Sequence, residues 1–188
     1  MDRESTAAPI QPGLPRRASF FWTVMLVVVL LLGAYFRVIH MNWDDSQHLH
    51  PDERFLTMVS SSVQWVDSIG AYFDTSTSTL SPYNSGYSFY VYGTLPLFIV
   101  RFVAERLAEI GYDQIYLVGR YISALFDLLT VLLVYIAGIR LYRDQRIAVL
   151  AAAFYSFAVL PIQLSHFYAT DTFLGFFGFL TLLLAIWV

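Results

Sequence analysis

Two adjacent carboxylates, Asp52 and Glu53, follow the first strongly apolar segment of the chain. Pro51 disfavours helix at His50 and is itself a favourable first helical residue, so we expect the two acids to open a short helix. The positive end of the helix dipole stabilises negative charge there. A fixed carboxylate pair at a membrane boundary could serve as a general base or hold a metal ion for chemistry on a lipid-borne substrate. An ordinary helix cap is the alternative interpretation.

Histidines and further acids surround this pair, and a divalent metal ion could bind some of them. Among the histidines, His50 is the candidate metal ligand. The spacing matches no fixed metal-binding signature, so the cofactor is unknown, with a divalent ion as one candidate. The group consists of Asp44, Asp45, His48, His50, Asp52 and Glu53.

Asp127 is a further acid of interest because it lies near the middle of a strongly apolar segment. A charged residue at the centre of a membrane helix costs roughly 2.5–3.5 kcal/mol on insertion scales, so we expect a compensating partner. Arg120, Ser123, Asp127 and Thr130 recur at three- and four-residue steps and share one helix face. That face could line a substrate cavity, or it could hydrogen-bond to other helices.

Arg37 and Arg120 each lie near one end of an apolar segment. A guanidinium group binds phosphate with two parallel hydrogen bonds, so either arginine could hold a phosphorylated substrate. Snorkelling of the side chains toward the membrane surface is the alternative explanation.

The composition is that of a membrane protein. Of the 188 residues 57% are hydrophobic and only 13% are charged, which is not typical of a soluble domain. The net charge is −3, and we expect no nucleic-acid partner because no basic footprint is present. The absence of cysteine excludes disulfides and thiolate metal sites from this sequence.

The apolar segments predict an all-α polytopic membrane protein with about four transmembrane helices. Residues 1–18, rich in proline and ending in two arginines, predict a disordered cytoplasmic tail. No cleavage site is evident after the first span, which favours an uncleaved anchor. We expect the spans at about residues 19–39, 116–138, 147–164 and 172–188.

Residues 40–115 are predicted to form a long outer loop that carries interfacial helices. Apolar residues spaced along residues 53–69 indicate an amphipathic helix that lies on the membrane. Residues 74–86 are rich in serine and threonine and indicate a flexible loop. Residues 87–110 are interrupted by proline and charges, so we expect a second interfacial helix there instead of a span.

The arginines near the span ends gather on one side of the predicted topology, and the positive-inside rule makes that side cytoplasmic. Asp52, Glu53 and Asp171 then share the outer face. We expect a multi-pass protein of the plasma (inner) membrane with a cytoplasmic N-terminus. The arginines concerned are Arg16, Arg17, Arg140, Arg143 and Arg146.

The order of these features resembles the GT-C membrane glycosyltransferases, especially their protein O-mannosyltransferase and lipid A aminoarabinose transferase branch. In that family an arginine near the end of the first span precedes an outer loop with an Asp-Glu pair, as Arg37 precedes Asp52 and Glu53 here. The aromatic, proline-containing residues 90–97 resemble the start of a juxtamembrane helix. They read Gly-Thr-Leu-Pro at 93–96, where relatives often have His or Lys followed by two prolines.

Later segments extend the resemblance over residues 20–188, as the N-terminal part of a GT-C transmembrane domain. Residues 119–125 resemble the arginine-led start of the second span, and residues 139–142 resemble its cytoplasmic exit. Residues 169–172 are similar to the segment with the second outer-loop aspartate. The sequence stops inside an apolar run, so we expect further spans to follow and these 188 residues alone to be inactive.

The resemblance implies transfer of a sugar from a polyprenyl-phosphate-linked donor to a lipid, glycan or protein acceptor on the outer face. Asp52 would be the general base, with Glu53 and Asp171 organising the acceptor or a metal. The residues expected to bind substrate are Arg37, Tyr92, Arg120 and Asp127. The alternative is a non-catalytic membrane subunit or scaffold, in which Asp127 and the glycines at 175 and 178 serve only helix packing.

Overall fold

The computed structural model describes residues 20–187, and the expected tail over residues 1–18 lies outside this part. Within it the chain is helical and has no strand, which confirms the all-α class. The helices are α1 (Phe20–Val38), α2 (Pro51–Ser62), α3 (Ile69–Phe73), the short 3-10 helix η1 (Pro82–Ser85), α4 (Thr94–Leu107), α5 (Tyr112–Tyr142), α6 (Gln145–Ser156), α7 (Val159–Ser165) and α8 (Asp171–Trp187).

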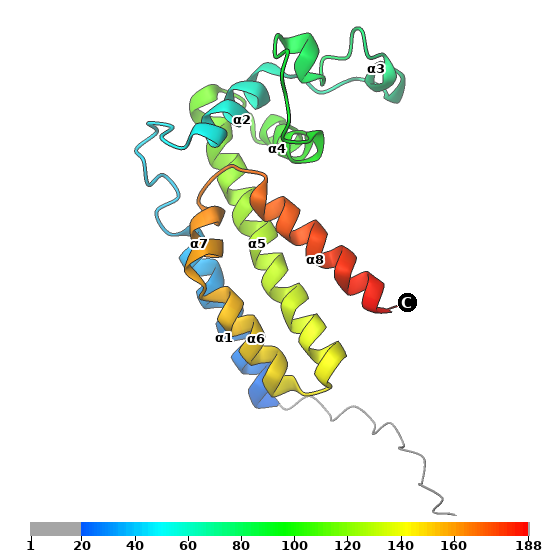
Figure 1. Ribbon diagram of the computed structural model, residues 1–188. Coiled ribbons are helices and arrows are strands. Elements are labelled where there is room, and N and C mark those ends of the chain that lie inside the picture. Colours follow the sequence, from blue (N-terminus) through cyan, green and yellow to red (C-terminus); the bar gives the residue numbers. More distant parts are fainter. Residues whose placement is uncertain (1–19, 188) are drawn as a thin grey trace, which may run out of the picture.

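Helix α5 is the axis of the structure. Its 31 residues extend over about 46 Å at the usual helical rise. Helices α1, α6 and α7 run along one side of α5, and α8 descends along another side (Figure 1). Helices α2 and α4 pack at the N-terminal end of α5, where α3 lies farther out (Figure 1). The segments between α1 and α5 therefore gather at one end of a helical bundle.

Two helices, α1 and α5, are long and apolar enough to cross a membrane. Helices α6 and α7 together would form a third span. Residues 171–186 of α8 are apolar but shorter, so the expected count of four spans stays a prediction. Helix α5 begins at Tyr112, before the expected start of the second span, and its first turns pack in the core, where Ile115 and Tyr116 are fully buried.

The span expected over residues 147–164 corresponds to α6 and α7, which are separated by a break and meet at 58°. Pro161 explains the break, because it lacks an N–H group and its ring clashes with the carbonyl four residues earlier. The Ser156 carbonyl at the end of α6 accepts a hydrogen bond from Arg37 Nη1 at 2.9 Å. An arginine of α1 thus satisfies a carbonyl at the end of the interrupted helix.

The amphipathic helix expected over residues 53–69 is wrong in extent, because helix α2 ends at Ser62. Its apolar face packs against α4 and α5, where Leu56 and Val59 are fully buried. Arg101 of α4 donates to the carbonyl of Ser60 at 3.1 Å, which stabilises the end of α2. The second expected helix is confirmed as α4, which begins at Thr94.

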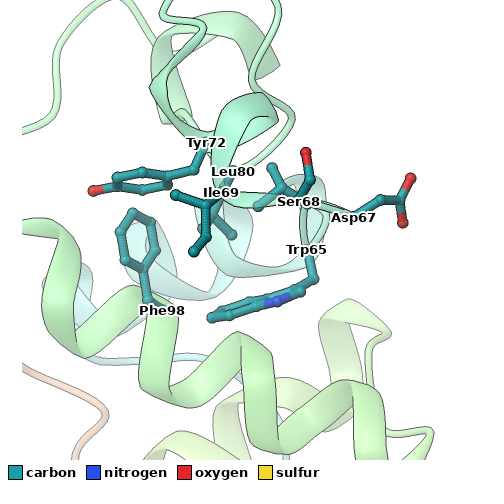
Figure 2. Close-up of a pocket in the computed structure, with 8 residues that line it drawn as sticks. Trp65, Asp67, Ser68, Ile69, Tyr72, Leu80 and Phe98 are labelled. Atoms are coloured by element: carbon teal, nitrogen blue, oxygen red, sulfur yellow. The ribbon is translucent and has the colours of Figure 1, made fainter.

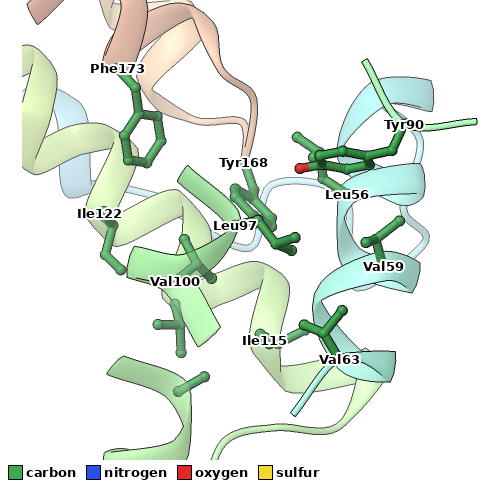
Figure 3. Close-up of a cluster of buried hydrophobic side chains, with 12 residues drawn as sticks. Leu56, Val59, Val63, Tyr90, Leu97, Val100, Ile115, Ile122, Tyr168 and Phe173 are labelled. Carbon is green, nitrogen blue, oxygen red and sulfur yellow. The ribbon is translucent and has the colours of Figure 1, made fainter. Parts of the chain in front are cut away.

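A hydrophobic core joins α2, α4 and α5 to the segment before α8 (Figure 3). Leu56, Leu97 and Ile115 contribute one fully buried side chain from each of the three helices. Tyr168 and Phe173 complete the core from the C-terminal part of the chain. This core fixes α2, and with it the carboxylates at the start of α2.

Candidate active site

Asp52 lies in the first turn of α2, as its position after Pro51 predicted. His50 caps this helix, because its Nδ1 accepts a hydrogen bond from the Glu53 backbone N–H at 3.3 Å. The Asp52 side chain is exposed, and Tyr92 Oη donates to its Oδ1 at 2.9 Å. Burial and the hydrogen bond to the Asp52 carboxylate raise the pKa of Tyr92, so its hydroxyl remains a donor at neutral pH.

Glu53 has the opposite environment to its neighbour, because its side chain is completely buried. Its two oxygens accept from Nε and Nη2 of Arg120, each at 2.7 Å, in a bidentate ion pair. Oε1 also accepts from the backbone N–H of Tyr168 at 2.8 Å. Of the two adjacent acids, Asp52 therefore faces solvent and Glu53 lies in the core, where Arg120 and the backbone of Tyr168 bind its carboxylate.

Arg120 holds a second buried carboxylate. Its Nη1 and Nη2 lie 3.1 and 3.0 Å from the two oxygens of Asp44, and Nη1 also donates to the Met41 carbonyl at 2.6 Å. Burial acts to raise the pKa of Asp44, but the hydrogen bonds and charge of Arg120 outweigh it and lower that pKa below its usual value. In this arrangement Arg120 binds two carboxylates and a carbonyl instead of a phosphate.

Arg37 forms a separate buried cluster with Asp127. Arg37 Nε lies 2.6 Å from Asp127 Oδ2, and Tyr155 Oη donates to Asp127 Oδ1 at 2.7 Å. The expected compensation for Asp127 is therefore present, and it comes from α1 and α6. Snorkelling of Arg37 is wrong, because the side chain has no exposed surface and also donates to the Gly33 carbonyl. The contacts of this cluster do not include Asp52 or Asp171.

Asp171 is the first residue of α8, and its side chain is exposed. The segment before it lies against α2, since the ring of Phe167 stacks on His50 with 4.3 Å between ring centroids. The residues that lead into the helices of Asp52 and Asp171 are thus in contact. The exposure of these two acids distinguishes them from Asp44 and Glu53, which Arg120 neutralises.

The described residues do not favour a metal site. Among residues 20–187, no group of three or more histidine or acidic side chains is arranged to hold an ion. His50 uses Nδ1 to cap α2, and Asp44 and Glu53 are paired with Arg120. A metal role for His50 stays a prediction, and no step below depends on one.

An apolar groove of about 500 Å³ is lined by the segment of residues 91–96 and by α8 with the residue before it. Tyr92, the partner of Asp52, lines it together with Thr170. On α8 the lining residues follow steps of three and four, so they form one helix face. The groove therefore extends along the apolar surface of α8 from Tyr92, whose hydroxyl donates to Asp52. Its other lining residues are Val91, Leu95, Pro96, Phe173, Leu174 and Phe177.

A second pocket, of about 400 Å³, lies between α3 and α4 (Figure 2). Trp65, Tyr72 and Phe98 surround it, whereas Asp67 points away from it in Figure 2. The pocket is apolar, and its lining includes none of the acids or arginines discussed above. We therefore place the candidate active site at Asp52 and not here.

Residues 71–188 match the sequence model of the family described as dolichyl-phosphate-mannose-protein mannosyltransferase. The chain belongs to this family. No curated protein and no solved structure matches the chain significantly. The family assignment confirms the GT-C resemblance and makes the chain a membrane glycosyltransferase of the mannosyltransferase kind.

The matched region of this mannosyltransferase-family chain includes Tyr92, Arg120 and Asp171, whereas Asp52 and Glu53 precede it. The choice of Asp52 as a candidate site residue therefore depends on the structure, in which Tyr92 of the matched region donates a hydrogen bond to Asp52.

Sequence reasoning missed three partners in the clusters: Tyr155 and Tyr168 altogether, and Asp44 as an arginine partner. Asp44 was visible only as one of several acids after the first apolar segment. Nothing in the spacing of Tyr155 or Tyr168 pointed to Asp127 or Glu53.

Proposed function

We propose that the protein transfers a sugar from a polyprenyl-phosphate donor to an acceptor hydroxyl on the outer face of the membrane, with Asp52 as general base. The observation that carries this proposal is the exposed Asp52 carboxylate, which accepts a hydrogen bond from Tyr92, a residue that lines an apolar groove. A lipid phosphate is already a leaving group, so the reaction needs no nucleotide pocket.

In the reaction, the acceptor oxygen attacks the anomeric carbon while the bond from that carbon to the phosphate oxygen breaks. Asp52 takes the acceptor proton through Oδ2, because Oδ1 is engaged by Tyr92. The phosphate leaves with the bonding electrons, and the anomeric centre is inverted. Asp171 accepts hydrogen bonds from the acceptor and orients it.

The apolar groove supports a lipid-linked donor. The reacting sugar must reach Asp52 while the lipid stays in the bilayer, and the groove extends along α8 from Tyr92, the hydrogen-bond partner of Asp52. In this proposal the isoprenoid chain lies against Leu174 and Phe177. Arg37, Arg120 and Asp127 act on substrate only through the elements they hold, since their charged groups already pair with each other or with Asp44 and Glu53.

The donor class can be tested with the purified full-length protein in lipid nanodiscs. We expect polyprenyl-phosphate mannose to support sugar transfer to a membrane extract, with one polyprenyl phosphate released per sugar transferred. GDP-mannose is the control donor and should be inactive. Transfer from the nucleotide sugar alone would contradict the donor assignment. An absence of transfer from either donor would favour the non-catalytic scaffold.

The orientation predicts which positions a membrane-impermeant maleimide reaches in intact cells. The sequence has no cysteine, so single cysteines can be placed at the exposed Thr77 and Arg146 and at Thr170. We expect labelling at Thr77 and Thr170, and labelling at Arg146 only after permeabilisation. Labelling at Arg146 but not at Thr77 in intact cells would reverse the orientation and remove Asp52 from the outer face.

A further inference from the structure

Tyr168 joins α2, α5 and the segment of residues 166–170 that leads into α8. Its side chain is completely buried. Its hydroxyl lies 2.8 Å from Ser60 Oγ, and its backbone N–H donates to Glu53 at 2.8 Å. In Figure 3 its ring lies among the core side chains, between α5 and α2 near Leu56 and Leu97. The residue therefore contacts α2 near both of its ends.

Gly119 of α5 provides the space for this ring. A Cβ atom at Gly119 would overlap the Tyr168 side chain at three of its carbon atoms. Glycine inside a helix is unfavourable relative to alanine, so its presence in α5 is explained by the space the ring needs. Arg120 directly follows, so one turn of α5 accommodates Tyr168 and supplies the cation that binds Glu53.

These contacts fix the two chain segments that carry the exposed acids. Asp52 directly precedes Glu53, and Asp171 follows Tyr168 by three residues. The bond between Tyr168 N–H and Glu53 joins the two segments directly. Displacement of the Tyr168 ring would therefore move the start of α8 relative to the start of α2.

We propose that Tyr168 is a positioning residue for sugar transfer. Held against Gly119 and bonded to Ser60 and Glu53, it sets the separation between Asp52 and Asp171. The inference rests on the proposed function, in which both acids meet the same acceptor. Tyr168 acts through these acids and does not touch the substrate, because its side chain is completely buried.

A distance measurement tests the geometry without any assay of activity. Spin labels at Met58 of α2 and Gly175 of α8, both exposed, should give one narrow distance in the full-length protein in nanodiscs. Gly119→Ala should shift or broaden it. The matched control is Gly178→Ala in α8, where a Cβ would meet no atom within 4 Å. An unchanged distance in Gly119→Ala would overturn the proposal.

Two milder variants keep the proposal testable if Gly119→Ala fails to fold. Tyr168→Phe and Ser60→Ala remove the same hydrogen bond and leave the ring in place. Each should lower kcat about 2- to 10-fold at unchanged donor KM, and each should lower the melting temperature slightly, because one buried hydroxyl loses its partner. The double variant should have a kcat no lower than that of either single variant. Tyr83→Phe is the control, because that exposed tyrosine lies outside the core.

Unchanged kcat in both single variants, or additive losses in the double variant, would overturn the proposal. An absence of transfer by the parent protein would instead refute the proposed function. The distance measurement would then still decide whether Tyr168 sets the separation of the two acids.

Discussion

Asp52→Asn should lower kcat by roughly 10²–10⁴-fold, because the amide cannot take the acceptor proton. Folding should be nearly unaffected. The side chain is exposed, His50 caps the helix, and the interaction of one exposed charge with the helix dipole is worth only about 0.3–1 kcal/mol. Initial rates with the full-length protein and a polyprenyl-phosphate sugar, together with melting temperatures, measure both effects.

The matched control for this variant is Asp67→Asn, which neutralises another exposed acid of the same loop. It should keep normal turnover. If Asp52→Asn also keeps near-normal turnover while Asp171→Asn abolishes it, the general base has been assigned to the wrong acid. If Asp52→Asn and Asp171→Asn both keep normal turnover, these two acids do not carry the chemistry.

Arg120→Met should destabilise the protein by about 3–5 kcal/mol, because it leaves the buried carboxylates of Asp44 and Glu53 without their cation. Arg120→Lys keeps the charge but loses the bidentate geometry, so its melting temperature should lie between those of Arg120→Met and the parent protein. Thermal unfolding in detergent gives the melting temperatures of the three proteins and so their order of stability.

An apolar replacement of the whole cluster is the control. Removing both carboxylates together with the cation eliminates the uncompensated charges, and such replacements are often neutral. We therefore expect Asp44→Leu, Glu53→Leu and Arg120→Met in combination to recover most of the stability lost in Arg120→Met alone. A single Arg120→Met variant as stable as the parent would contradict the importance of this cluster.

Low pH should remove the part of this stabilisation that comes from the ion pair between Asp44 and Arg120. The pKa of Asp44 is lowered in the folded state, so its contribution is complete above the ordinary aspartate value of 3.8 and is lost as the pH falls through the lower folded value. The difference in melting temperature between the parent and Asp44→Asn should therefore be constant at neutral pH and should shrink below about pH 4.

The start of α2 could be predicted from sequence because its determinants are local. Pro51 disfavours helix before it and favours helix after it, so the position of Asp52 follows from its neighbours. The division between Asp52 and Glu53 could not be predicted, because Glu53 is buried by residues 67 and 115 positions away. Asp52 and Glu53 are adjacent acids, and the sequence around them does not indicate which of the two faces the core.

The partner of Asp127 could not be predicted either, because it is also distant in the sequence. The cost of a charge in an apolar helix predicted that a partner exists, but not that Arg37, 90 residues earlier, would supply it. The break between α6 and α7 differs, because its cause is local. Pro161 lies inside the expected third span, and its effect on a helix could have been applied to the sequence directly.

The cluster around Arg120 also constrains the order of assembly during synthesis. Asp44 and Glu53 leave the ribosome 76 and 67 residues before the arginine that neutralises them. At roughly 5–20 residues per second, both acids wait several seconds without their partner. Tyr168 is made later still, 115 residues after Glu53. The loop that carries Asp52 therefore cannot take its final shape until the helices that follow it have entered the bilayer, and the candidate active site is among the last parts of this region to form.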